Sequence, residues 1–173
     1  MPDRNPFAPA NPKEAEVLSG GKWIGVTGPR PEPLYAEYSV NIPKAGTYAF
    51  FVRKFWEHGP FRYRWDDQPW KNVGRQFALL DEAPIRKYLV ANWIEAGTVN
   101  LTSGSHSLRV ETTENDGAAC FDCFLLINGP FDARGKLKPN EKTNLADEGW
   151  FAFEPGIDPF SNSPIDLRKL NEK

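Results

Sequence analysis

Residues 46–70, GTYAFFVRKFWEHGPFRYRWDDQPW, alternate apolar and polar side chains on both sides of a short turn. Successive side chains of a β-strand point to opposite faces, so this alternation predicts two antiparallel strands that are each half buried. The inward-facing residues are predicted to be Tyr48, Phe50, Val52, Phe61, Tyr63 and Trp65. The stretch therefore predicts the framework of a β-sheet with one buried face.

Short strand-like segments separated by turns continue along the chain. Alternating or continuous apolar patterns predict further strands over residues 35–42, 90–101, 106–114 and 120–129. Pro- and Gly-containing turns separate them, while residues 74–88 have mixed periodicity and are interrupted by Pro84. No long amphipathic helix is predicted over residues 14–130. The sequence therefore predicts an all-β fold, an antiparallel β-sandwich.

The chain divides into three parts. Residues 1–12 are rich in proline and are predicted as a flexible lead-in, and residues 13–131 as the sandwich of a single domain. Residues 132–173 are polar and rich in Pro and Asn, which predicts a mostly irregular C-terminal extension. Its aromatic side chains lead us to expect that part of it packs on the sandwich, with a short helical turn near its end; disorder is the alternative.

Charge and hydropathy exclude several classes of partner. The formal net charge is -2 and the basic residues are scattered, so nucleic acid, which needs a clustered basic face, is not an expected partner. The apolar runs are too short to span a bilayer, and no membrane contact is expected. The polar N-terminus lacks the apolar core of a signal peptide. The protein is therefore either cytoplasmic or part of a longer protein whose targeting segment is missing here.

The two cysteines, Cys120 and Cys123, are predicted to be buried thiols. Residues three apart on a strand point to opposite faces, which makes a disulfide between them awkward. The two histidines of the chain, His58 and His106, are not spaced to complete a zinc site with them.

Catalysis is not predicted. Asp66 and Asp67 are adjacent on the chain, so their side chains diverge and cannot flank one glycosidic bond; capping of a turn is the simpler role. Neither histidine has an acidic or nucleophilic partner nearby in the sequence. No nucleophile elbow or Gly-rich phosphate loop is present. The chain is therefore expected not to be an enzyme.

Four motifs occur together in a recognisable order: EAE at residues 14–16, YSVNIPKAGTYAFFVR, GTVNLTSGSHSLRV and FDCFLLINGPF. Over residues 13–131 this order resembles the jelly-roll, galactose-binding-like β-sandwich of carbohydrate-binding modules, similar to families 6 and 35. The ending SPIDLRKLNEK resembles the junction that leads into a glycoside-hydrolase-type barrel. The resemblance implies a non-catalytic, monomeric module that targets a C-terminal catalytic domain, absent from this chain, to a polysaccharide or oligosaccharide. It also implies that the full-length protein is secreted or periplasmic.

A structural calcium ion is implied by the same resemblance. Glu14 and Glu16 share one face of a predicted extended segment, where two carboxylates can hold a hard cation or face solvent. In the family two such glutamates meet an Asp of the last strand, and Asp122 matches that position. A carboxylate in an apolar strand is costly unless it is paired, and a cation would neutralise it. Glu14, Glu16 and Asp122 are therefore the expected metal ligands.

The resemblance also implies a sugar site in loops at one end of the sandwich. An indole can cover the apolar CH face of a pyranose, while polar side chains bind its hydroxyl groups. By position the candidates are Trp93, Asn115, Asp116 and Trp23, and Trp56 and Trp70 are added because they flank turns. Burial in the core is the alternative for each tryptophan.

The identity of the sugar is not predicted, but four arginines bear on its charge. Guanidinium groups pair well with carboxylate or sulfate, so Arg53, Arg62, Arg64 and Arg75 could favour an acidic polysaccharide. The alternative is solvated charge on sheet faces. Two further functions stay open: an interaction module whose aromatic patch docks the extension or the catalytic domain, and a spacer sandwich without a binding site.

Overall fold

The computed structural model describes residues 16–21, 23–55, 58–76, 78, 80–86, 89–133 and 150–153. Side chains are described in these ranges except in residues 81–86, 89–90 and 150–153. The regular structure of this part of the chain consists of strands, apart from one short 3-10 helix, η1 (Ser19–Gly21), and the helical residue Glu16. Within it, no helix has the length and apolar character needed to cross a bilayer.

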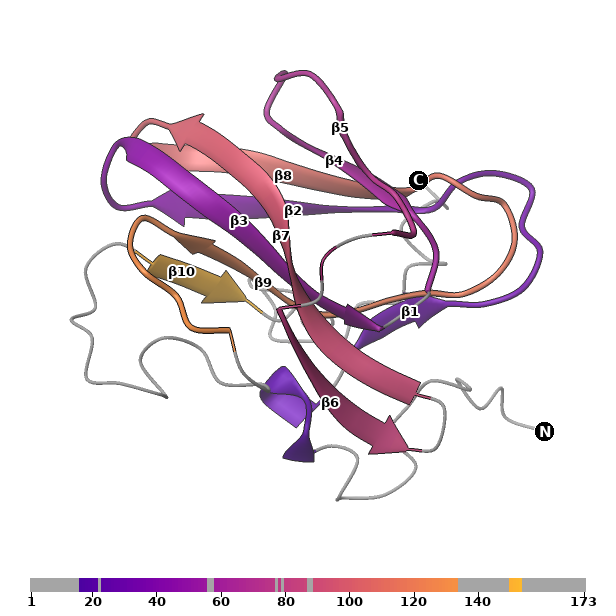
Figure 1. The fold of residues 1–173 in the computed structure, drawn as a ribbon. Coiled ribbons are helices and arrows are strands. Elements are labelled where there is room, and N and C mark those ends of the chain that lie inside the picture. The colour runs from indigo at the N-terminus through magenta and orange to yellow at the C-terminus, as the bar shows by residue number, and fades with distance from the viewer. Residues whose placement is uncertain are drawn as a thin grey trace.

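The strands form two antiparallel sheets (Figure 1). The six-stranded sheet has the order β1 (Ile24–Val26), β9 (Ala119–Ile127), β3 (Gly46–Phe55), β7 (Leu89–Leu101) and β6 (Asp81–Arg86), and β10 (Trp150–Phe153) also pairs with β9. The four-stranded sheet has the order β2 (Tyr35–Ile42), β8 (Gly104–Thr112), β4 (Phe61–Trp65) and β5 (Lys71–Val73). The predicted all-β, sandwich-like architecture is confirmed.

The two sheets face each other across one apolar core. Phe50 of β3 lies with its ring centroid 5.8 Å from that of Trp65 on β4, and Tyr38 of β2 lies 5.9 Å from Phe124 of β9. All six residues predicted to face inward from the hairpin at 46–70 are buried in this core. The alternation in the sequence therefore assigned these side chains to the correct face, because burial of one sheet face requires a period of two residues.

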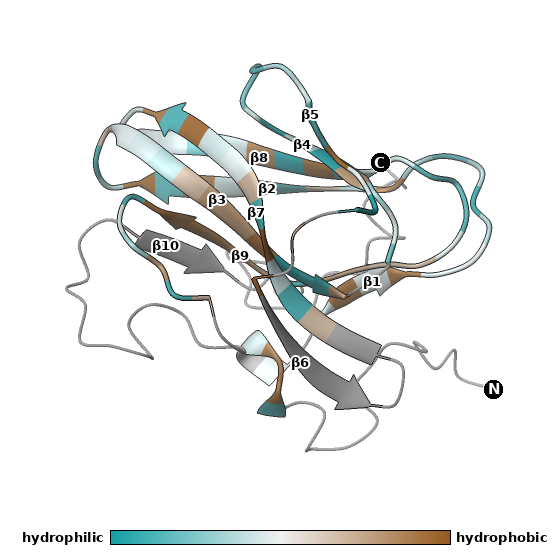
Figure 2. Cartoon of the chain, viewed as in Figure 1, coloured by the Kyte–Doolittle hydropathy of each residue, from teal (hydrophilic) through white to brown (hydrophobic). Residues whose placement is uncertain are grey.

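Strand β9 is buried along its whole length, which explains its nearly continuous apolar sequence (Figure 2). One of its faces lines the core, and the other is covered by smaller clusters that include Trp23 and Phe131. Its pairing with β3 shifts between Arg53, which is opposite Cys123, and Lys54, which is opposite Phe121. Asp122 lies at this irregularity, between the two paired positions Phe121 and Cys123.

Several expectations outside the core are corrected or extended. Glu16 has a helical conformation, so the segment expected to be extended at residues 14–16 is not a strand at its described end. The ambiguous residues 74–88 contain β6, which includes Pro84; β6 lies at the edge of its sheet, where proline is tolerated. Four residues of the extension form β10, which was not predicted. The lead-in 1–12 and the expected helical turn near the C-terminus lie outside the described residues.

Candidate functional site

Two of the tryptophans expected to bind sugar are buried. Trp93 is fully buried on the outer face of the six-stranded sheet, with its ring 5.1 Å from that of Phe131. Trp23 is 6% exposed and packs edge-on against Phe55 at 4.9 Å. A pyranose cannot stack on an indole that the chain itself covers, so both positions are corrected from candidate sugar platforms to packing residues. Trp56 lies outside the described residues.

The predicted polar loop is exposed and is held in place by an arginine. Asn115 and Asp116 lie in the turn between β8 and β9, and both are exposed. The backbone N–H of Arg30 donates to Asn115 O at 2.8 Å, and its guanidinium donates to Glu114 O at 2.7 Å and Gly117 O at 3.1 Å. These bonds join two loops at one end of the sandwich. The loop is thus ordered with two polar side chains facing solvent, as a hydrogen-bonding subsite requires.

Trp70 is the predicted tryptophan that remains partly exposed. It precedes β5, and its ring lies beneath two guanidinium groups, with the Cζ atoms of Arg62 and Arg64 at 4.5 and 4.9 Å from the ring centroid. Such cation–π contacts hold both the indole and the arginines in place. Trp70 follows the turn after Trp65, whereas the loop at Asn115 follows Thr112, which pairs with the opposite end of β4. The structure therefore does not bring Trp70 and Asn115 together.

The outer face of the four-stranded sheet is polar and rich in arginine. We define the arginine face by outward-facing residues of β2, β4 and β8 together with Trp70, which precedes β5. They are Tyr35, Glu37, Arg62, Arg64, Trp70, Arg109 and Glu111. Arg62 binds Glu111, with Nε and Nη2 at 3.1 and 3.0 Å from Oε2. Arg109 lies over the ring of Tyr35, with Cζ 3.8 Å from the centroid. Arg109 was not among the arginines that the sequence indicated.

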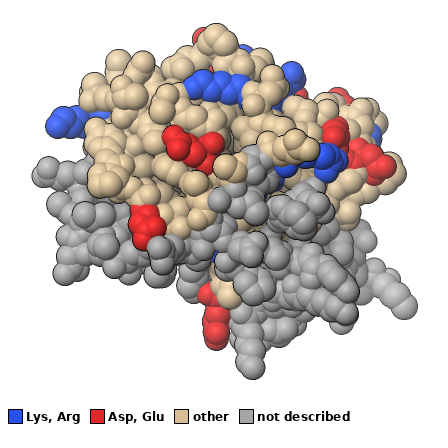
Figure 3. Space-filling view, in the orientation of Figure 1, with Lys and Arg blue, Asp and Glu red and all other residues tan. Residues whose placement is uncertain are grey.

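Two of the four arginines expected to meet an acidic ligand are engaged elsewhere. Arg53 is fully buried against Asp122, and Arg75 forms an ion pair with Glu114 near the loop end. On the side seen in Figure 3, basic and acidic atoms are interspersed among uncharged ones. On the arginine face itself, Glu37 is opposite Arg109 and Glu111 is opposite Arg62, so the face is defined by its local arrangement and not by a large excess of positive charge.

The calcium site implied by the resemblance can be tested at Asp122. This carboxylate is fully buried, its Oδ2 lies 2.5 Å from Arg53 Nη1, and its Oδ1 accepts the backbone N–H of Ser19 at 2.9 Å. The same Nη1 donates to Val17 O at 2.8 Å. The guanidinium thus neutralises the carboxylate at the place where a cation was expected, and it would repel one.

The other two expected ligands do not complete a site there. The side chain of Glu16 is exposed, and Glu14 lies outside the described residues. Over the described ranges, no group of three or more His, Cys, Asp or Glu side chains is arranged to hold a metal ion. With Arg53 in place, the described residues do not fit a calcium ion at Asp122.

The structure brings together a His–Asp pair that the sequence did not reveal. His106 Nδ1 lies 2.7 Å from Asp66 Oδ2, and its Nε2 lies 2.9 Å from Thr102 O. Asp66 lies in the predicted turn with a positive φ of 49°, and its Oδ1 accepts the N–H of Ser107 at 2.8 Å, so its carboxylate binds β8 and does not cap its own turn. Both ring nitrogens are engaged, and none is left to act as a base on a substrate. The pair joins two turns and raises the pKa of His106 above its ordinary value through the hydrogen bond to Asp66.

A buried ammonium group closes the other end of the sandwich. Lys54 is fully buried and donates to His58 O and, at 3.0 Å, to Gly59 O. Burial lowers the pKa of Lys54 to about 8, and burial together with the nearby ammonium lowers that of His58 to about 4. These groups fix the turn between β3 and β4. The arrangement stabilises backbone carbonyls and presents no open site.

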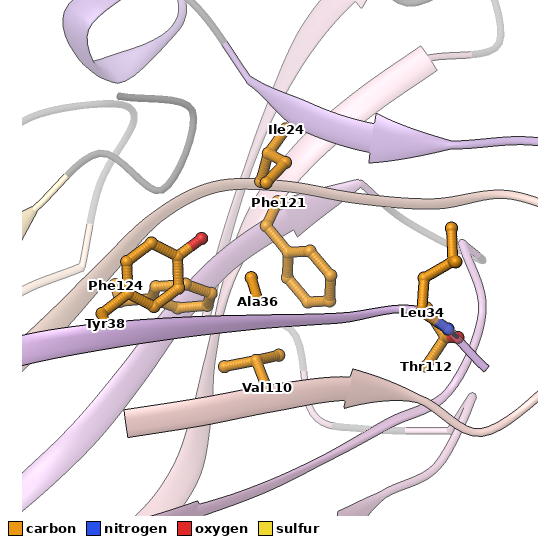
Figure 4. A pocket seen from close by; sticks show the side chains of 8 residues that line it. All are labelled: Ile24, Leu34, Ala36, Tyr38, Val110, Thr112, Phe121 and Phe124. Carbon is orange, nitrogen blue, oxygen red and sulfur yellow. Dashed lines mark hydrogen bonds between the residues drawn. The ribbon is translucent and has the colours of Figure 1, made fainter. Parts of the chain in front are cut away.

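A small apolar hollow lies between the two sheets (Figure 4). Its lining comprises Ile24, Leu34, Ala36, Tyr38, Val110, Thr112, Phe121 and Phe124. The hydroxyl of Thr112 already accepts the N–H of Leu34 at 3.0 Å. A ligand site needs several convergent polar groups as well as apolar walls, so this hollow is a feature of core packing.

Both cysteines are buried and form no disulfide, as predicted. The expectation that they lie on opposite faces of the strand was wrong, because the register shift at Asp122 puts both of them in the outer-face clusters of β9. Burial raises the pKa of the Cys120 thiol well above its ordinary value, so the reactive thiolate is disfavoured.

Of the expected binding residues, Trp70 and the loop pair Asn115 and Asp116 are therefore at least partly accessible, on separate parts of the surface. The chain matches no protein-family model and no curated protein.

Proposed function

We propose that this chain is a non-catalytic carbohydrate-binding module whose jelly-roll, galactose-binding-like sandwich attaches an appended catalytic domain to a polysaccharide. The observation that supports this function best is Trp70, a partly exposed indole on an open sheet face and held in place by Arg62 and Arg64. An indole stabilises the apolar face of a sugar by stacking, and fixed polar groups around it replace the hydrogen bonds that the sugar loses to water.

Hydroxyl and amide groups continue the same face along the strands. Ser39 is opposite Ser107, and Asn41 is opposite Ser105, in the pairing of β2 with β8. The hydroxyls of Ser39 and Ser105 lie 3.2 Å apart. Together with Trp70 these groups form a polar track along the strands, which suits an extended glycan chain. The exposed loop at Asn115 and Asp116 is a second candidate contact, at the end of the sandwich that the family resemblance indicates.

Calcium is not required for this proposal. Arg53 supplies the charge opposite Asp122, and together they bind Val17 O and Ser19 N and so tie the segment before β1 to the sheet. Sugar binding is accordingly expected to be the same in calcium and in a chelator.

The proposal is tested by affinity electrophoresis of the chain in gels that contain soluble neutral or acidic polysaccharides. Retardation by at least one glycan is expected, and Trp70→Ala should abolish it. Leu80→Ala is the matched control, because Leu80 is an exposed apolar residue outside the arginine face. Asn115→Ala and Asp116→Ala report on the loop. If no glycan retards the wild type, the proposed function is refuted.

The alternative is a sandwich that packs against a neighbouring catalytic domain without binding sugar. One observation favours it over sugar binding: the outer-face aromatics Phe51 and Trp93 are covered by Phe131, from the segment that follows β9, and so cannot stack on a sugar. This alternative predicts no retardation by any glycan, together with a stable complex with the catalytic domain in size-exclusion chromatography. Release of reducing sugar by the isolated chain would contradict both functions.

A further inference from the structure

We propose that the arginine face binds an anionic glycan, one that bears carboxylate or sulfate groups, and that Arg64 and Arg109 form the anion site. The inference rests on the proposed function and names its ligand class. The sequence pointed to a set of arginines, but only the strand register shows which of them lie together.

Arg64 and Arg109 are placed directly opposite each other in the pairing of β4 with β8. Directly opposed side chains have Cβ atoms about 5 Å apart, and like charges in such a pair destabilise the sheet. The carboxylate oxygen Oε2 of Glu37 lies 3.9 Å from Arg109 Nη1, which is beyond hydrogen-bonding distance. Within the described part of the chain, Arg64 has no hydrogen bond or ion pair. The two charges are thus incompletely neutralised by the chain.

Both arginines also carry unused hydrogen-bond donors. The Nε atoms of Arg64 and Arg109 are shielded from solvent and have no hydrogen-bond acceptor among the described residues. A donor without an acceptor costs free energy. Both side chains are partly exposed, so an acceptor can approach their guanidinium groups from solvent. A carboxylate or sulfate placed between the two guanidinium groups supplies oxygen atoms to both and also relieves their repulsion.

Aromatic rings hold the two guanidinium groups in place before a ligand arrives. Arg64 Cζ lies 4.9 Å from the centroid of Trp70, and Arg109 Cζ lies 3.8 Å from that of Tyr35. A guanidinium fixed against a ring loses less conformational freedom on binding than a free one. Arg62 differs, since Glu111 already occupies its Nε and Nη2. The anion site therefore consists of Arg64 and Arg109, beside the track of Ser39 and Ser107.

The test compares Arg64→Gln, Arg109→Gln and the double variant with the wild type in affinity electrophoresis and calorimetry. The ligands are polygalacturonate as the carboxylate probe, dextran sulfate as the sulfate probe, and neutral galactomannan. We expect the wild type to bind at least one of the two anionic probes, less tightly as salt is raised. Each single variant should weaken that binding roughly tenfold to a hundredfold. Comparison of the two probes shows which anion the site prefers.

Arg75→Gln is the matched control, because it removes the same charge from an exposed arginine outside the arginine face. It should leave binding unchanged. Unfolding midpoints identify any variant that does not fold, and Arg64→Gln is expected to fold at least as stably as the wild type because it removes a like-charge pair.

The outcomes separate the inference from the proposed function. Anionic binding that is unaffected by both substitutions, or reduced as much by Arg75→Gln, overturns the inference. Binding of galactomannan or other neutral glycans without binding of either anionic probe overturns it too, while the proposed function stands. Failure to bind any glycan refutes the proposed function itself.

Discussion

The buried pair of Arg53 and Asp122 gives the sharpest test of how this sheet is held together. Both side chains are completely buried, and the pair also binds the backbone at Val17 and Ser19. Replacing one partner, by Arg53→Met or Asp122→Asn, leaves the other charge buried and unpaired. Such a change costs about 3–5 kcal/mol, because the desolvation of the remaining charge is no longer offset.

The double variant Arg53→Met/Asp122→Leu removes both charges and fills the space with apolar groups. A buried ion pair is often replaced in this way at little cost, although here Val17 O and Ser19 N lose their partners, at about 1–3 kcal/mol each. We therefore expect the double variant to be less destabilised than the sum of the two single variants. The difference measures the coupling between the two side chains.

Urea unfolding at pH 7, with calcium and with a chelator, measures these effects. For a urea dependence of about 2 kcal/mol per M, each single variant should lower the midpoint by about 2 M. Arg75→Met is the control, because its partner Glu114 is exposed and a surface pair contributes at most about 1 kcal/mol. The coupling is refuted if the stability losses of the two single variants add up to that of the double variant, or if each single variant loses less than about 1 kcal/mol. A wild-type midpoint that falls on chelation refutes the view that Arg53 replaces calcium, and supports the ion implied by the resemblance.

Three further predictions concern titratable side chains. The stability difference between wild type and His106→Gln should be largest between pH 3.8 and 6.5. The pKa of Asp66 is lowered, so its contribution to stability is lost as pH falls, and the pKa of His106 is raised, so its contribution is lost as pH rises. Urea midpoints of both proteins across this range measure the difference, and a difference that does not change with pH contradicts the pair. The folded-state pKa of Lys54, about 8, lies below its ordinary value of 10.5. The wild type should therefore gain stability relative to Lys54→Met as pH rises between these two values. If the stabilities of the two proteins change with pH in parallel, a buried ammonium is contradicted. Cys120 and Cys123 should react with a disulfide reagent only after unfolding, and rapid labelling of the native protein would show that the outer face of β9 opens.

The strands and their buried faces were predictable because period-two alternation is a local signal. Tyr48, Phe50 and Val52 needed only their neighbours in the sequence to be assigned to one face. Trp93 was different, because its burial depends on Phe131, which the chain brings across the outer face of the sheet from beyond β9. No pattern within one strand reports whether its second face will be covered.

The partners of charged residues were likewise beyond local reasoning. Asp122 needed a counter-charge, and the sequence could not show that Arg53, 69 positions away, supplies it. The opposition of Arg64 and Arg109 depends on the register between β4 and β8, and a shift of one residue would remove it. The His–Asp pair at His106 depends in the same way on two turns that meet only in the folded sheet.

The pairing of β9 has a consequence for where this unit can be cut. One edge of β9 is shared by two short strands, β1 opposite residues 119–121 and β10 opposite residues 124–127, while β3 occupies the other edge. A fragment that ends at residue 131, where the sequence suggested a boundary, would uncover the backbone of 124–127 in an apolar strand. Uncovered edges of this kind recruit other strands, so such a fragment is expected to self-associate. The six-stranded sheet thus includes residues 150–153, and this part of the extension completes the sheet that it follows.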